Sequence, residues 1–236
     1  MSTSPKEFKR PPKRYEPKGL KILYEDRDLL VVNKAPGLLT VRTEGVREKT
    51  ATFLLNEYVR KGNPKSPHRV FVVHRLDKDT SGVLLFAKSE SAKRFLQDEW
   101  QNFKKTYYAV VRGGPSEGEG VLTSYLAENS AHNMYSVKDP AKGKLAKTGF
   151  KVIQESGGHS LLELDLLTGR KNQIRVQLAE EGCPVLGDKK YGAKKKGAKR
   201  LALHAGSLQF VHPHSKQSIT LTAPTPSYFK FLMKDS

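Results

Sequence analysis

Hydrophobic and polar positions alternate in short, distinct patterns along the chain from residue 20 onward. Apolar runs and two-residue alternation predict strands at 20–24, 29–33, 70–73, 83–87, 106–111, 148–154, 160–167, 201–210 and 218–221. Helical spacing of apolar residues predicts helices at 50–60, 89–103, 171–181 and 227–233. Because strands and helices mix without a regular βα order, the pattern indicates an α+β fold with a mixed, mostly antiparallel sheet.

The first 18 residues differ from the rest. They combine four prolines with six lysines and arginines and few apolar residues, which predicts a disordered basic arm at 1–18 and a folded domain at 19–236. No apolar run is long enough to span a membrane, and no signal peptide is evident. A single cysteine, Cys183, excludes an internal disulfide. We therefore expect a cytoplasmic protein, with a monomer as the default.

The charge narrows the choice of partner. Lys and Arg total 42 against 24 acidic residues, a formal net charge of +18, which favours a nucleic acid over a membrane surface or a charge that serves solubility alone. The segment 189–200 holds seven cations and no acid. Its lysines, Lys194, Lys195 and Lys196 among them, are candidates for a phosphate clamp.

The candidate chemistry is concentrated at 74–83, between two predicted strands. Asp77 follows Arg75 by two residues, and Thr80 begins a Thr-Ser-Gly turn. Taken alone, an aspartate in such a polar loop is more often a turn or cap residue than a catalyst. His-Arg-Leu-Asp is similar to the His-Arg-Asp of protein kinases, but the acid comes one residue late and no glycine-rich loop precedes it.

Metal and phosphate-loop motifs are not convincing. His212 and His214 are expected to be two surface histidines in a turn, without a third ligand in register, so no metal site is predicted. Strand alternation places Tyr107 on one face of its strand, and Arg175 lies among polar side chains near the start of a helix, where an exposed helix face is the ordinary alternative.

Several blocks, taken together, make the chain resemble the RluA-type pseudouridine synthases. They are Asn-Lys-Ala-Pro-Gly at 33–37, His-Arg-Leu-Asp at 74–77 with Thr-Ser-Gly at 80–82, Lys-Thr-Tyr-Tyr-Ala at 105–109, Thr-Gly-Arg at 168–170 with Gln-Ile-Arg-Val at 173–176, Pro-Val-Leu-Gly-Asp at 184–188 and Leu-Ala-Leu-His-Ala at 201–205. Asn172 and Gln177 stand where the family usually has histidine. The first predicted strand begins at Leu20, which leaves no room in front of it for the S4 domain of some relatives.

The resemblance implies the pseudouridine synthase catalytic fold at 19–236 and an isomerase that converts specific uridines in tRNA or rRNA to pseudouridine by base flipping. It implies Asp77 as the catalytic carboxylate, Arg175 as its cation and Tyr107 as a ring that stacks on the base and assists proton transfer. Substrate contacts are expected from Arg75, His74, Thr80, Arg170, Asn172, Gln173, Leu203, Lys194, Lys195 and Lys196. No cofactor or metal is expected. The alternative is a non-catalytic RNA-binding or ribosome-assembly factor on the same fold.

Overall fold

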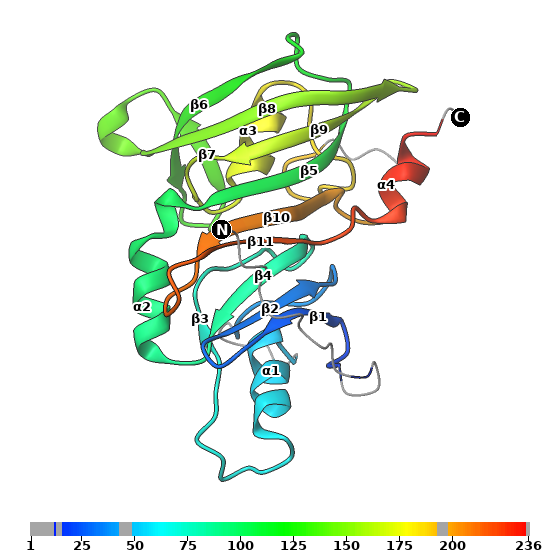
Figure 1. Cartoon of the computed structure of the whole chain (residues 1–236). Helices are drawn as coiled ribbons and strands as arrows, with labels where there is room; N and C mark the ends of the chain where they lie inside the picture. The colour runs from blue at the N-terminus through cyan, green and yellow to red at the C-terminus, as the bar shows by residue number, and fades with distance from the viewer. Residues whose placement is uncertain (1–11, 13–15, 43–48, 193–197, 235–236) are drawn as a thin grey trace. The chain divides into compact units, whose positions relative to one another are not determined.

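The computed structural model describes residue 12 and residues 16–42, 49–192 and 198–234 (Figure 1). The chain divides into two compact units. The first spans Met1–Phe103 and Leu208–Ala223, and the second spans Lys104–Ser207 and Pro224–Ser236. Most of the basic arm lies outside the described residues, and one domain over 19–236 stays a prediction.

The first unit is built on a group of antiparallel strands. They are β1 (Leu20–Glu25), β2 (Leu29–Lys34), β3 (Phe71–Val72), β4 (Ser81–Ala87) and β11 (Ser218–Thr222). β2 pairs with β1 on one side and with β4 on the other, while β3 also pairs with β4. Every residue of β4 is buried, so this strand forms the centre of the unit's core. That burial explains the apolar run Val-Leu-Leu-Phe-Ala at 83–87.

Two helices complete the first unit, and side-chain caps fix where both begin. α1 (Ala51–Arg60) starts after Thr50, whose side chain accepts the Phe53 N–H at 3.2 Å. α2 (Glu90–Asp98) starts after Ser89, whose hydroxyl accepts the Ala92 N–H at 3.1 Å. Such caps satisfy N–H groups that the helix itself leaves without partners. A short 3-10 helix, η2 (Trp100–Asn102), follows, so the predicted helix at 89–103 is in fact two segments.

The second unit contains a five-stranded antiparallel ladder in the order β5-β9-β8-β6-β7 (Figure 1). Its strands are β5 (Lys104–Arg112), β6 (Glu119–Glu128), β7 (Met134–Val137), β8 (Lys144–Ser156) and β9 (His159–Leu166). The helix α3 (Gln173–Glu180) packs against β6, β7 and β8. The 3-10 helix η3 (Pro140–Lys142) and the closing helix α4 (Ser227–Leu232) also belong to this unit.

The α+β class and the antiparallel strand pairing predicted from the sequence are confirmed. The division between the units falls inside β10 (Leu203–Val211), a strand that pairs with β11 and whose residues from Leu208 onward belong to the first unit. Two strands, β6 and β7, were not predicted, because most β6 residues are exposed or half-buried and give no clear alternation. Among the described helices, none combines the length and the apolar character needed to cross a membrane.

The prediction that His212 and His214 are both surface residues is wrong for His212. His214 is exposed, but His212 is buried, and its Nε2 lies 2.8 Å from Oδ2 of Asp26. Its Nδ1 accepts the N–H groups of His214 and Ser215. Nδ1 is therefore unprotonated, and Nε2–H donates to Asp26.

Candidate active site

Asp77 lies in a loop whose backbone is held on both sides. On the N-terminal side, the buried hydroxyl of Thr40 donates to the Leu76 carbonyl at 2.8 Å and accepts the Leu76 N–H at 3.2 Å. On the C-terminal side, the Lys78 carbonyl accepts the Gly37 N–H at 2.9 Å and the Lys34 ammonium at 3.0 Å. The Thr80 N–H donates to the Asp77 carbonyl and closes the turn. Such fixed backbone is what a positioned catalytic group requires.

Lys34 is a fully buried lysine at the end of β2. Its ammonium donates to the carbonyls of Ala35, Leu38 and Lys78 at 2.9 to 3.1 Å, which satisfies all three of its donors. Burial lowers the pKa of Lys34 from 10.5 to about 8, although the nearby charges of Asp79 and Asp77 oppose this shift. The lysine thus joins the 35–38 turn to the Asp77 loop and adds positive charge beneath it.

The other predicted site residues of this loop differ in exposure. Arg75 is exposed, Asp77 is half-buried and Thr80 is buried. The ring of His74 stacks on Trp100 at a centroid distance of 4.4 Å, and its Nε2 accepts the Leu85 N–H at 3.1 Å. His74 therefore anchors the loop to β4 through its ring.

In the second unit, Tyr107 is a buried residue of β5, opposite Leu164 of β9. Leu203 is buried at the start of β10. The Arg170 Nε donates to the Leu145 carbonyl at 3.0 Å, which fixes the segment that leads into α3.

Gln173, the first residue of α3, is buried and fully hydrogen-bonded within its unit. Its Oε1 accepts from the Thr168 hydroxyl and the Arg170 N–H, and its Nε2 donates to the Lys147 carbonyl and the Thr148 hydroxyl. An amide has two donors and two acceptor positions, so this arrangement leaves none for a substrate. Gln173 fixes the start of α3 instead.

Gln177, one of the two departures from the family pattern, lies one turn further along the same face of α3. Its Oε1 accepts the Thr148 hydroxyl at 2.7 Å, and its Nε2 contacts the carbonyls of Leu122 and Ala146 and the Ser124 hydroxyl. The Thr148 hydroxyl therefore connects Gln173 and Gln177. These buried contacts hold α3 against β6 and β8.

Arg175 projects from α3, and its guanidinium donates to both carboxylate oxygens of Asp188. Its Nε lies 2.7 Å from Oδ2 and its Nη2 lies 2.8 Å from Oδ1. Burial alone would raise the pKa of Asp188, but the guanidinium and the N–H groups of Tyr191 and Lys190 outweigh burial and lower it. The sequence did not single out Asp188 for this role, although it lies within one of the family blocks.

The loop around Asp188 needs glycine at both ends. Gly187 has a φ of 71°, and a Cβ there would lie 2.1 Å from the Arg200 carbonyl oxygen. A Cβ on Gly192 would lie 2.4 Å from the Asp188 carbonyl oxygen. These close approaches give a physical reason for both glycines.

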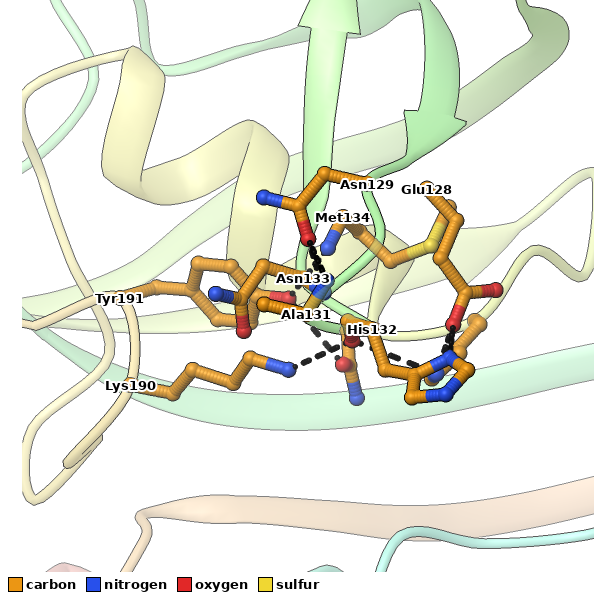
Figure 2. A network of polar contacts seen from close by, with 10 residues as sticks. Glu128, Asn129, Ala131, His132, Asn133, Met134, Lys190 and Tyr191 are labelled. Atoms are coloured by element: carbon orange, nitrogen blue, oxygen red, sulfur yellow. Dashed lines mark hydrogen bonds and ion pairs between the residues drawn. The ribbon is translucent and has the colours of Figure 1, made fainter.

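Tyr191 joins this loop to the turn between β6 and β7 (Figure 2). Its hydroxyl donates to Oδ1 of Asn172 at 3.2 Å and accepts the Met134 N–H at 3.0 Å. Its ring faces the Arg175 guanidinium, 5.1 Å from the centroid. Nearby, the Lys190 ammonium donates to the His132 carbonyl at 2.9 Å. Asn172, the second departure from the family pattern, has a φ of 52°, a conformation that asparagine tolerates well.

The first unit has one group of potential metal ligands among the described residues: Asp26, Asp28 and His212. Both oxygens of Asp26 accept hydrogen bonds, from Tyr24, His212 and the N–H groups of Asp28 and Leu29. Both ring nitrogens of His212 are also used. The group fits a hydrogen-bonded link between two turns better than a metal site.

Within the first unit, then, the structure places His74, Arg75, Asp77 and Thr80 on one loop. Within the second, it gathers Asn172 and Arg175 around Tyr191. Lys194, Lys195 and Lys196 lie outside the described residues.

Comparisons with known proteins agree on one family. Residues 28–180 match the family model for RNA pseudouridylate synthases. The chain is 37% identical over 219 residues to the uncharacterized RNA pseudouridine synthase YhcT of Bacillus subtilis, covering 91% of this chain and 72% of that protein. It is 35% identical to the ribosomal large subunit pseudouridine synthase C of Buchnera aphidicola, covering 91% and 70%.

Solved structures support the same assignment. The human RNA pseudouridylate synthase domain containing 1 protein superposes with a TM-score of 0.69 at 28% identity, covering 92% of this chain and 86% of that one. The domain containing 4 protein has a TM-score of 0.74 over 89% and 90% of the two chains, and at 24% identity it supports the fold alone. The chain belongs to the RNA pseudouridylate synthase family, whose members are isomerases, and within it to the RluA type indicated by its sequence blocks.

Proposed function

We propose that this isomerase converts uridine in rRNA or tRNA to pseudouridine and that Asp77 is its catalytic carboxylate. The observation that carries the proposal is the Asp77 loop, whose backbone is held by buried Thr40 and Lys34 while the side chain stays half-buried beside an exposed arginine. Anchors of this kind hold a functional side chain in a fixed geometry.

The reaction rearranges atoms without adding or removing any. The N1–C1′ bond breaks, the base turns, a C5–C1′ bond forms, and the proton at C5 is lost while N1 gains one. Asp77 supplies the nucleophile or base that these reaction steps require. Tyr107 contributes a ring that stacks on uracil and a hydroxyl that assists the proton transfer at C5.

We propose that Arg175 keeps the catalytic carboxylate charged, and that Asp188 fixes the orientation of Arg175. The bidentate contact uses the Nε and Nη2 edge of the guanidinium and limits the directions in which its remaining N–H groups point. Asp188 is thus a positioning residue. In the same way, we assign Gln173 to holding α3, and Arg75, Arg170 and Asn172 to substrate contacts.

The net charge of +18 supports an RNA substrate, and the name of the Buchnera relative makes large-subunit rRNA the first substrate to test. Total rRNA and tRNA are isolated from cells that lack the protein and incubated with it. Pseudouridine is then mapped by carbodiimide-dependent stops of reverse transcription. A new stop in rRNA or tRNA is expected; no new stop in either would overturn the proposed function.

A further inference from the structure

The first unit contains a cavity of about 860 Å³ that the catalytic proposal does not use. Such a volume lies within the range of roughly 300–1,000 Å³ found for ligand sites. Cations from three separate segments line it: Arg27 between β1 and β2, Lys61 at the end of α1, and Arg69 before β3. Cations near the end of one helix are ordinary complements to its dipole, but here only Lys61 belongs to that helix end.

The cavity's carboxylates are neutralised within the unit. Glu25 accepts from the Lys88 ammonium at 2.9 Å and from the Tyr58 hydroxyl at 2.8 Å. Glu57 lies 3.7 Å from the Arg60 guanidinium. Within the described part of the chain, no carboxylate pairs with Arg27, Lys61 or Arg69. The lining therefore presents three positive charges, those of Arg27, Lys61 and Arg69, that no lining carboxylate neutralises, since Glu25 and Glu57 are paired with Lys88 and Arg60.

Arg69 is also held in place. Its guanidinium lies over the Phe71 ring, 4.8 Å from the centroid, which orients the group and leaves its N–H edge available. Guanidinium groups suit phosphate because they donate two parallel hydrogen bonds. The guanidinium of Arg69 and its fixed position over the Phe71 ring both favour an anionic ligand of the phosphate class.

The cavity lies at the far end of the unit's central strand from the Asp77 loop. β4 begins at Ser81, just after that loop, and ends at Ala87, beside the lining residue Lys88. The seven residues of β4 are separated by six steps, which correspond to roughly 20 Å. A group bound here is too distant to touch the reacting base, yet a polymer that carries the base can reach both places.

We propose that this cavity is a second RNA contact, which binds phosphodiester groups of the substrate outside the target uridine. The proposal rests on the proposed function for its ligand, because that function supplies a polyanion long enough to span the two places. Its role is to raise affinity for RNAs with the right flanking structure, and so to select substrates without entering the chemistry.

The test compares two double variants with equal loss of charge. Arg27→Gln with Lys61→Gln removes two exposed lining cations, and Lys230→Gln with Lys234→Gln removes two exposed cations on and beside α4. Binding to the full-length substrate RNA, before its uridine is converted, is measured over a salt series. The kcat and KM for pseudouridine formation are measured on the same RNA. Each lost phosphate contact reduces the magnitude of the slope of log K against log salt by about 0.7–0.9, so the slope of the lining variant should be about 1.5 shallower. If the two proteins bind equally at about 1 M salt, the lining variant should bind roughly 30-fold more weakly near 0.1 M salt.

The α4 variant should keep nearly the wild-type slope, and saturating kcat should be unchanged in both. On an RNA truncated to the target loop, the lining variant should match the wild-type protein. The proposal is overturned if both variants lose affinity equally, or if the lining variant binds like the wild-type protein. If the wild-type chain binds RNA but forms no pseudouridine, the proposed function fails, while the binding series still decides the role of the cavity.

Discussion

Arg175 and Asp188 form a two-point contact, with Nε and Nη2 at 2.7 and 2.8 Å from the two carboxylate oxygens. The carboxylate also accepts the N–H groups of Lys190 and Tyr191, so one side chain fixes both the loop and the arginine. A buried pair of this kind adds little net stability, since desolvating both charges offsets their attraction. The pair instead fixes the orientation of the Arg175 guanidinium.

Asp188→Asn should therefore impair catalysis more than binding. Asparagine keeps one acceptor for the loop N–H groups but loses the charge and one contact to Arg175. A charge-assisted hydrogen bond contributes about 1.5–3 kcal/mol, so kcat should fall roughly ten- to hundred-fold with little change in KM. The measurement is steady-state kinetics with thermal unfolding alongside. An unchanged kcat together with a lower melting temperature would mean that Asp188 serves stability alone.

Thr40→Val should loosen the Asp77 loop. The change keeps the side-chain volume but leaves the buried N–H and carbonyl of Leu76 without the threonine hydroxyl. The free energy of unfolding should fall by about 1–3 kcal/mol, and kcat should fall with it. Thr220→Val, at an exposed position of β11, is the control and should stay within about 0.5 kcal/mol of the wild-type protein. Equal effects of the two substitutions would refute this account of Thr40.

The lowered pKa of buried Lys34 predicts that the stability of the protein depends on pH. Its folded pKa of about 8 lies below the ordinary 10.5, so between these values the unfolded chain binds more protons than the folded one. The Lys34 contribution to stability is therefore constant below pH 8 and rises with pH from 8 to 10.5, by up to about 3 kcal/mol. Denaturant unfolding of wild-type and Lys34→Met proteins across this range gives the difference. A difference that does not change with pH contradicts the assignment.

Gln177→His, which restores the residue usual in the family, should destabilise this chain. A neutral imidazole has one donor and one acceptor, so it cannot replace the contacts to Thr148, Ser124 and the β6 and β8 carbonyls. The expected loss in free energy of unfolding is about 1–3 kcal/mol. Gln209→His, at an exposed position of β10, provides the matched control. A Gln177→His protein as stable as the wild type would show that α3 does not depend on this amide.

Much of the fold was predictable because its central strands are buried on both faces and its helices carry their caps in the sequence. Ser89 and Thr50 are such caps. β6 and β7 were missed because their stability comes from pairing with neighbours rather than from an apolar pattern of their own. The buried state of His212 was also missed, since its partner Asp26 is distant in sequence.

The site residues were predicted as types and positions, but their partners were not. A sequence pattern brings Asp77 and Arg175 to notice, whereas the hydrogen bonds of Thr40, Lys34 and Asp188 depend on tertiary geometry. Gln173 shows the converse, because a residue within a family block proves to be fully occupied in holding its own helix.

Proton release from C5 of the target uridine shows directly whether Asp77 is the catalytic carboxylate. RNA labelled with tritium at C5 is incubated with the wild-type protein, Asp77→Asn, and Asp79→Asn, which removes an exposed carboxylate two residues away. We expect the wild-type and Asp79→Asn proteins to release tritium in step with pseudouridine formation, and Asp77→Asn to release none above background. Release by Asp77→Asn at the wild-type rate would contradict the catalytic role of Asp77.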